Sequence, residues 1–339
     1  MAYAKNVMNP QTTLLNPVTK RTLAPFNADL QAMLLAAVRG RKKVTDAHLR
    51  VIDRDVEIEG TLTRVHCYAP TLDGNGRMRI KRLAEFLRDR VIEYAIPRSK
   101  LEKAQDYLNE TNSPSEIVKL HIEAKNLFTK LKNTGEGGEF LLFALAEPVF
   151  GLTQILCKMS LKTATGVHYH GTDGVYARCD SEGYLYVYWG ESKVYADVTT
   201  AITDCLKSLA PYLLDEPAED ASSARDIVLV NEFADFSDQN LIAALKRYFD
   251  DDDAKSNKLR YCGVALVGFD CEGFPAEGEI GIWETIEPAL RAALPNWSAH
   301  VGKRVVQEKI ESFDIHFICV PMRSVDEFRK YFLSLLETA

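Results

Sequence analysis

The sequence lacks the patterns that mark several common classes of protein. Its seven cysteines are scattered and odd in number, and no two are spaced as CxxC, which argues against a disulfide framework and a zinc ribbon. We therefore expect buried, reduced thiols. No run of about 18 apolar residues occurs, so a membrane-spanning helix is not expected either.

Two further motifs are missing. The opening stretch MAYAKNVMNPQTTLLNPVTKR does not have the charged-then-apolar order of a signal peptide, and we expect a cytoplasmic protein. No phosphate loop of the type GxxxxGKS or GxxxxGKT is present, so hydrolysis of ATP by that route is not expected. A Ser-His-Asp or Cys-His triad cannot be assigned from the sequence, because such triads are recognised by their geometry.

Charge is present in quantity but is unevenly distributed. The formal net charge is -7, yet residues 77–106 contain nine basic and five acidic side chains, whereas residues 215–253 contain three basic and twelve acidic ones. A second basic cluster consists of Arg39, Arg41, Lys42 and Lys43. Binding responds to the local field, so the net charge does not exclude a nucleic-acid partner. Solvated helix faces are the simpler reading of such runs.

The length of 339 residues, 46% of them hydrophobic, predicts two packed units. We place the boundary at NTGEGG, residues 133–138, between an N-terminal accessory domain (1–132) and a second domain (133–339). The accessory domain is expected to be mostly helical α+β, with a helix at 27–38, a strand region at 51–68 and helices up to 132. Two capping boxes are predicted in it, Ser99 with Glu102 and Ser113 with Glu116.

The second domain is expected to begin with a buried helix, EFLLFALAEPVF, which is apolar nearly all round. Three strand-like runs and a helix follow, at 155–163, 174–179, 184–195 and 196–214. Strands at 259–269 and 313–322 extend the same sheet, and further helices are predicted at 239–249, 284–293 and 325–337, the last capped by Ser324 and Glu327. The fold class is therefore α/β.

A charged pair at the end of a strand marks the candidate site. In YVYWGESKVY, Glu191 and Lys193 project to the same face because strand side chains alternate. Asp173 precedes the strand GVYARC, which the short DSEG turn makes the antiparallel neighbour of the Glu191 strand. Glu139, in the first turn of the buried helix, is a third carboxylate, and the helix dipole favours a negative charge there. An exposed ion pair alone would contribute only about 0–1 kcal/mol.

Carboxylates beside a lysine suit the metal-dependent hydrolysis of a phosphodiester. Carboxylate oxygens bind hard cations, and Mg²⁺ neutralises the phosphate and activates a water molecule. Lys193 can help to deprotonate or orient that water and can stabilise the pentacovalent phosphorane. We therefore predict a Mg²⁺ (or Mn²⁺) site with Asp173, Glu191 and Glu139 as its ligands.

The order helix, strand, strand, strand, helix, with an Asp followed by E-x-K, looks like the PD-(D/E)xK nuclease core. The stretches HGTDGVYAR, YVYWGESKVY and GGEFLLFALAE resemble the HamA family of nuclease subunits from the Hachiman anti-phage defence system. FLRDRVIEYAIP and FDIHFICVPMRSVDEFRKYFLSLL extend the resemblance over most of the chain.

The resemblance implies a metal-dependent DNA endonuclease that works with HamB, a superfamily 2 helicase, and is restrained by it. It implies that Asp173, Glu191 and Lys193 are the catalytic positions, with Glu139 as a fourth. The sequence departs from the motif at Thr172, where the bare pattern has a proline.

Other interpretations stay open. The chain could be a catalytically silent subunit that uses a nuclease fold to hold a helicase and DNA, or an RNA nuclease, because the core does not report the sugar. His168 and His170 could bind zinc, although no further ligand completes a set nearby. Lys158 and Lys162 could bind phosphate or act as strand-edge charges.

Two segments invite a nucleic-acid interpretation with weaker support. Tyr184, Tyr186 and Tyr188 alternate along one strand, a pattern more typical of a sheet face than of a base-stacking platform. The acidic region 215–253 could cover the basic N-terminal surface or a partner's DNA channel as an autoinhibitory mimic, a hypothesis that rests on the charge asymmetry alone.

Overall fold

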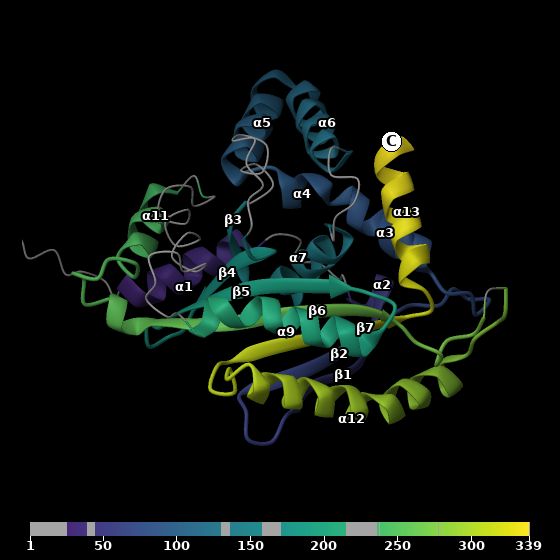
Figure 1. Ribbon diagram of the computed structural model, residues 1–339. Coiled ribbons are helices and arrows are strands. Elements are labelled where there is room, and N and C mark those ends of the chain that lie inside the picture. Colours follow the sequence, from purple (N-terminus) through teal and green to yellow (C-terminus); the bar gives the residue numbers. More distant parts are fainter. Residues whose placement is uncertain are drawn as a thin grey trace, which may run out of the picture.

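A mixed β-sheet runs through the molecule and helices cover both of its faces (Figure 1). The computed structural model describes residues 26–38, 45–129, 136–157, 171–214, 236, 238–276 and 278–338. Within these residues the sheet has seven strands in the order β1-β2-β7-β6-β5-β4-β3. The predicted α/β class is confirmed. In the same residues, no helix combines the length and the apolar character needed to cross a bilayer.

Four neighbouring strands in the sheet are parallel: β2 (Thr63–Pro70), β7 (Ile315–Met322), β6 (Leu259–Asp270) and β5 (Leu185–Val194). Antiparallel pairing adds β1 (Leu49–Glu57) to β2, β4 (Gly174–Cys179) to β5, and β3 (Thr153–Leu156) to β4. All eight residues of β7 are buried, as expected for a parallel strand that is covered on both faces.

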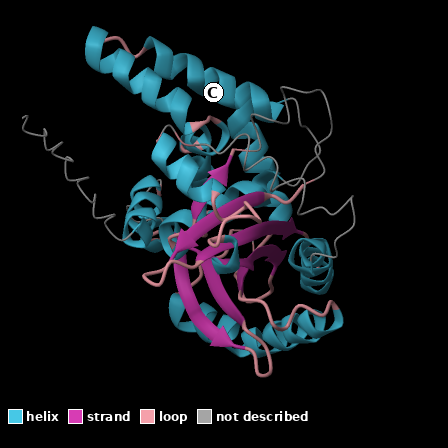
Figure 2. Ribbon diagram, turned by 90° about the vertical axis from the view of Figure 1, so that its left-hand side faces the viewer, coloured by secondary structure: helices cyan, strands magenta, loops and turns pink. Residues whose placement is uncertain are grey.

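The first face of the sheet is covered by α7 (Glu136–Phe150), whose residues 140–146 are each at most 1% exposed. The same hydrophobic cluster contains residues of α3 (Ile80–Asp89), α4 (Val91–Ala95), α6 (Ser115–Thr129) and α13 (Val325–Thr338). Helix α5 (Arg98–Thr111) and α6 together form the hairpin that projects from the rest of the molecule in Figure 2.

The second face is covered by α1 (Phe26–Ala37), α9 (Val198–Leu214), α11 (Gln239–Lys246) and α12 (Trp283–Gln307). Two short elements lead into strands, α2 (Thr45–His48) into β1 and a 3-10 helix (Ser256–Lys258) into β6. Strand β5 contributes to both clusters by alternation: Trp189 packs with the second face and Tyr188 with the first.

The N-terminal region does not form a sheet of its own. The predicted strand region 51–68 is a hairpin, β1 and β2, and β2 pairs in parallel with β7. The hairpin is thereby part of the sheet that contains β4 and β5, and an N-terminal accessory domain is not confirmed. Part of the predicted boundary, residues 133–135, lies outside the described residues, as does most of the predicted strand 155–163.

Helix ends differ from the prediction in two places. Helix α12 continues through Pro295, whereas it was predicted to end at residue 293, because Trp297, Val301 and Val305 are buried against the sheet beyond the proline. Helix α5 begins at Arg98 without a side-chain cap, so the capping box at Ser99 is wrong.

The other two predicted caps are half formed. The N–H of Glu327 donates to Ser324 Oγ (3.2 Å), while the Glu327 carboxylate pairs with Arg323. The N–H of Ser115 donates to Ser113 Oγ (3.4 Å). The carboxylate of Glu116, the expected partner of Ser113, instead pairs with a lysine one turn further along the helix.

The cysteines are free thiols, as the sequence predicted. All seven cysteines are free thiols, and all except Cys271 are buried.

A buried ion pair joins α5, α7 and β3. Arg98 donates to the Glu147 carboxylate (3.0 Å) and to the carbonyl of Gln154 (2.7 Å), and the N–H of Gln154 donates to Glu147 (2.9 Å). The side chains of Arg98 and Glu147 are 9% and 0% exposed. Loss of either partner would leave an uncompensated charge in a dry environment.

We predict that Arg98→Met lowers the free energy of unfolding by about 3–5 kcal/mol, the typical cost of breaking a buried pair. Lys100→Met, also in the first turns of α5, removes only the exposed pair with Glu123 and should cost about 0–1 kcal/mol. Urea unfolding followed by circular dichroism measures both. Equal losses in the two variants would contradict the prediction.

Candidate active site

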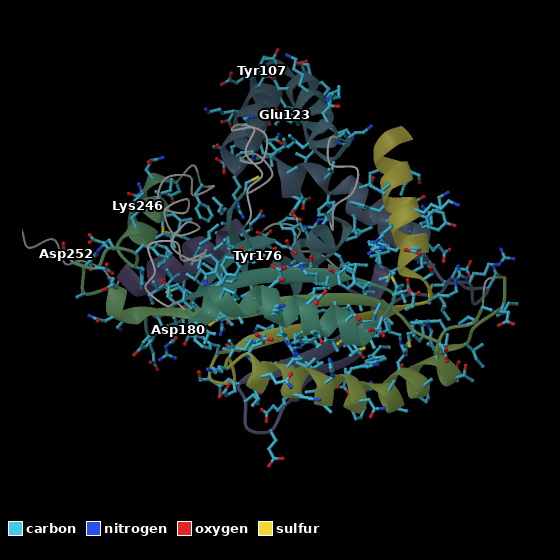
Figure 3. The ribbon with its side chains drawn as sticks, in the orientation of Figure 1. Tyr107, Glu123, Tyr176, Asp180, Lys246 and Asp252 are labelled. Atoms are coloured by element: carbon cyan, nitrogen blue, oxygen red, sulfur yellow. The ribbon has the colours of Figure 1, made fainter. Side chains whose placement is uncertain are left out.

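The β4–β5 hairpin brings the predicted site residues together. Gly174 pairs with Gly190 in the antiparallel register, and the N–H of Asp173 donates to the carbonyl of Gly190 (2.8 Å). Asp173, the residue before β4, therefore lies next to the point where β5 continues into Glu191 and Ser192. The turn at the other end of the hairpin is tight, as predicted, and Asp180, labelled in Figure 3, accepts backbone N–H groups there.

The two glycines of the register allow the backbone to approach the ring of Tyr176 closely. A Cβ atom on Gly174 would lie 2.6 Å from the ring of Tyr176, and one on Gly190 would lie 3.0 Å from the same ring. Tyr176 is labelled near the middle of Figure 3. These glycines therefore let the hairpin close directly beside the acidic residues.

Asp173 is held by Ser192, a residue that the sequence did not single out. Its Oδ2 accepts hydrogen bonds from the N–H (2.7 Å) and the Oγ (2.6 Å) of Ser192. Ser192 in turn lies against the start of α7, where a Cβ atom on Gly138 would be 3.0 Å from its Oγ. The helix and the strand are thus in direct contact beside the aspartate.

Glu191 and Lys193 form the contact that strand alternation predicts. Lys193 Nζ donates to Glu191 Oε1 at 2.5 Å. Glu191 is 5% exposed, so this is a largely buried pair rather than the exposed pair of the simpler reading. The two residues project to the face that carries α9, where Cys205 Sγ lies 3.5 Å from the carbonyl of Glu191.

Glu139 approaches from the opposite face of the sheet. It lies in the first turn of α7, is 8% exposed, and its Oε2 accepts a hydrogen bond from the hydroxyl of Tyr94 (3.0 Å). Tyr94 comes from α4 and is fully buried, so the first 132 residues supply part of the site's surroundings. Sequence reasoning missed this partner because the two residues are 45 positions apart.

The charges at the hairpin end act on one another. Desolvation raises the pKa of Asp173 well above its ordinary value, and the carboxylates of Glu139 and Glu191 raise it further, against the opposing effects of Ser192 and Lys193. Burial disfavours the Lys193 ammonium, but Glu191 and Asp173 outweigh it and raise the pKa of Lys193. The site therefore concentrates negative charge around one retained ammonium.

A complete protein-only metal site is not formed in the described parts of the chain: no group of three or more His, Cys, Asp or Glu there is arranged to hold an ion. The donors present nevertheless suit Mg²⁺, which usually binds through one or two carboxylates and completes its shell with water and phosphate oxygens. The mutual repulsion at Asp173 is the kind that a bound divalent cation relieves. Asp173 and Glu191 fit this role, and Glu139 is engaged by Tyr94.

Several candidates cannot be placed relative to this site. Residues 158–170 lie outside the described parts of the chain, and with them His168, His170, Lys158 and Lys162. The same holds for residues 215–235 of the acidic region.

Comparison with known proteins gives the chain its family. The HamA family model matches residues 46–336, a range that includes all four predicted site residues and the β1–β2 hairpin. The chain belongs to the HamA family. It is accordingly a component of Hachiman defence. No curated protein matches the sequence.

The raised pKa of Asp173 predicts how the stability of this HamA-family chain depends on pH when EDTA keeps divalent cations from binding. A carboxyl group whose pKa is raised on folding destabilises the native state as the pH rises from about 4 through the folded pKa. Asp173→Asn keeps an acceptor for Ser192 and removes the charge. We expect it to increase the free energy of unfolding at pH 8, because it removes a charge that burial and the two neighbouring carboxylates disfavour.

The gain should shrink as the pH is lowered toward 5, and urea titrations at several pH values measure it. Asp326→Asn, a change at an 84% exposed carboxylate in α13, is the matched control and should show no such trend. An Asp173→Asn protein that is less stable than the wild type at pH 8 would refute the electrostatic account.

Proposed function

We propose that this HamA-family chain is a Mg²⁺-dependent (or Mn²⁺-dependent) DNA endonuclease that acts in the cytoplasm as the effector of Hachiman defence. The proposal rests on the β4–β5 hairpin, which puts Asp173 in hydrogen-bond contact with the residues on either side of Glu191, and on the pairing of Glu191 with Lys193. The order α7, β3, β4, β5, α9 also agrees with the helix-strand-strand-strand-helix order of PD-(D/E)xK nucleases.

Asp173 and Glu191 would hold the metal ion. When bound, Mg²⁺ would neutralise phosphate charge and lower the pKa of a coordinated water. Ser192 fixes the orientation of the Asp173 carboxylate through two hydrogen bonds, and the contact between α7 and β5 fixes Ser192. Preorganised ligands of this kind spend no free energy on rearrangement when the substrate arrives.

Lys193 would act as a cation and not as a base. Its pKa is raised by Glu191 and Asp173, so the ammonium keeps its proton at neutral pH. An ammonium beside the two carboxylates can donate to a phosphate oxygen and stabilise the negative charge that develops as the phosphodiester is attacked. Of the roles open to Lys193, orientation and charge stabilisation are therefore favoured over deprotonation of water.

The partner in the proposal is a HamB-like superfamily 2 helicase, which would restrain the nuclease and supply ATP-dependent movement on DNA. DNA is preferred to RNA on the strength of the family alone, and parallel assays on both polymers distinguish them. A catalytically silent subunit would bind DNA without Mg²⁺-dependent cleavage.

We expect Glu191→Gln and Lys193→Met each to reduce plasmid cleavage in Mg²⁺ by about 100-fold or more, the usual effect of removing one group that stabilises the transition state. Glu284→Gln and Lys303→Met, both at exposed positions of α12, are the matched controls and should cleave as the wild type does. Cleavage should require Mg²⁺ and stop in EDTA.

The assay is run with the chain alone and with the helicase and ATP, because a restrained nuclease can be silent by itself. Unfolding midpoints of all four variants separate lost chemistry from lost folding. Full cleavage by folded Glu191→Gln protein would end the proposal. DNA binding without cleavage in either arm would establish the silent subunit instead.

A further inference from the structure

A large pocket lies at the end of β5 opposite to Glu191. Its volume is about 920 Å³, within the range of pockets that bind small ligands. It is lined by the β1–β2 turn and by the starts of β5 and β6, together with Arg178 near the end of β4. Tyr186, in this pocket, precedes Glu191 by five residues, or about 17 Å at 3.3 Å per residue. The pocket is therefore separate from the candidate active site.

Three residues paired across neighbouring strands form a row of two cations and an aromatic ring in the pocket. Arg178 of β4 pairs with Tyr186 of β5, and Tyr186 pairs with Arg260 of β6. Direct neighbours in register project to the same face. Both guanidinium groups lie over the Tyr186 ring, at 4.7 Å for Arg178 and 5.5 Å for Arg260. Two cations from separate strands thus flank one half-exposed aromatic ring.

The neighbouring residues hold this row in place. Arg178 Nε donates to the hydroxyl of Tyr188 (2.9 Å), which donates to Asp314 Oδ2 (3.3 Å). Arg64 donates to the other oxygen of Asp314 (2.7 Å). One carboxylate therefore lies between two arginines, and Arg260 has no carboxylate partner among the described residues.

Of the three acidic residues that line the pocket, Asp314 pairs with Arg64 and lies 3.7 Å from Arg178, whereas the other two are at a distance from the row. Glu57 and Glu59 line it from the β1–β2 turn. Strand β1 is three places from β6 and five places from β4, which is about 14 Å and 24 Å at 4.8 Å per strand. Asp180 is nearer, but its oxygens already accept hydrogen bonds from two backbone N–H groups and the Tyr186 hydroxyl.

We propose that this pocket binds a nucleoside 5′-phosphate, either as a free nucleotide or as the 5′ end of a nucleic-acid strand. Arg178 and Arg260 would bind the phosphate, since guanidinium groups match its oxygens. The Tyr186 ring and the guanidinium planes offer stacking surfaces for a base. Glu57 and Glu59, on the far side, can accept hydrogen bonds from sugar hydroxyls or base amino groups. The site uses none of the proposed catalytic residues.

The test uses the full chain carrying Glu191→Gln, so that a nucleic-acid probe is not cut. Adenosine 5′-monophosphate, a 5′-phosphorylated tetrathymidylate, its unphosphorylated form and inorganic phosphate are titrated by calorimetry. Arg260→Gln should weaken binding of the two phosphorylated probes about tenfold, the value of one charge-assisted hydrogen bond. Tyr186→Leu should weaken them as well but leave the affinity for inorganic phosphate unchanged.

Arg82→Gln, at a 66% exposed arginine of α3, is the matched control and should bind as the parent does. Tighter binding of the phosphorylated tetranucleotide identifies a strand end, and equal or tighter binding of the monophosphate identifies a free nucleotide. The proposal is overturned by inorganic phosphate binding as tightly as the nucleotides, by Arg260→Gln having no effect, or by the absence of saturable binding up to about 10 mM.

Discussion

The pairing of Gly174 with Gly190 determines where the charges of the candidate site lie. It sets Asp173 against the β5 segment that carries Glu191, Ser192 and Lys193. A side chain at either glycine would crowd the Tyr176 ring, most severely at Gly174. A slip of one residue would turn Glu191 and Lys193 to the other face of the sheet. The chemistry proposed for this chain therefore requires the correct backbone register, because the register positions the carboxylates.

The sequence predicted the parts of the site that are local. Strand alternation gave the shared face of Glu191 and Lys193, and the DSEG turn gave the hairpin that brings Asp173 beside them. Ser192 escaped notice because alternation puts it on the opposite face, although its N–H and Oγ both reach Asp173. Tyr94 could not have been found, since its contact with Glu139 depends on how α4 packs against α7.

The same distinction holds for the fold. Periodicity and turn residues predicted the α/β class and most elements, because these are local properties of the chain. They gave no indication that β2 would pair with β7, and the first 132 residues therefore looked like a separate unit. The end of α12 was misjudged for a related reason: the burial of Trp297 and Val301 outweighs the break that Pro295 suggests.

Strand β7 lies between β2 and β6 in the sheet, but β2 and β7 are far apart in the sequence. His66 of β2 and His316 of β7, whose ring nitrogens are 3.0 Å apart, are separated by 250 residues. While the chain is being synthesised, β2 and β6 each have an unpaired edge until the residues of β7 emerge. Parallel pairing over such a separation is slow, and open edges favour aggregation. Arg329 of α13, later still, donates to the carbonyl of Val194 beside Lys193. The contact that Arg329 makes beside the proposed catalytic pair therefore forms only after β7 has been made, late in the synthesis of the chain.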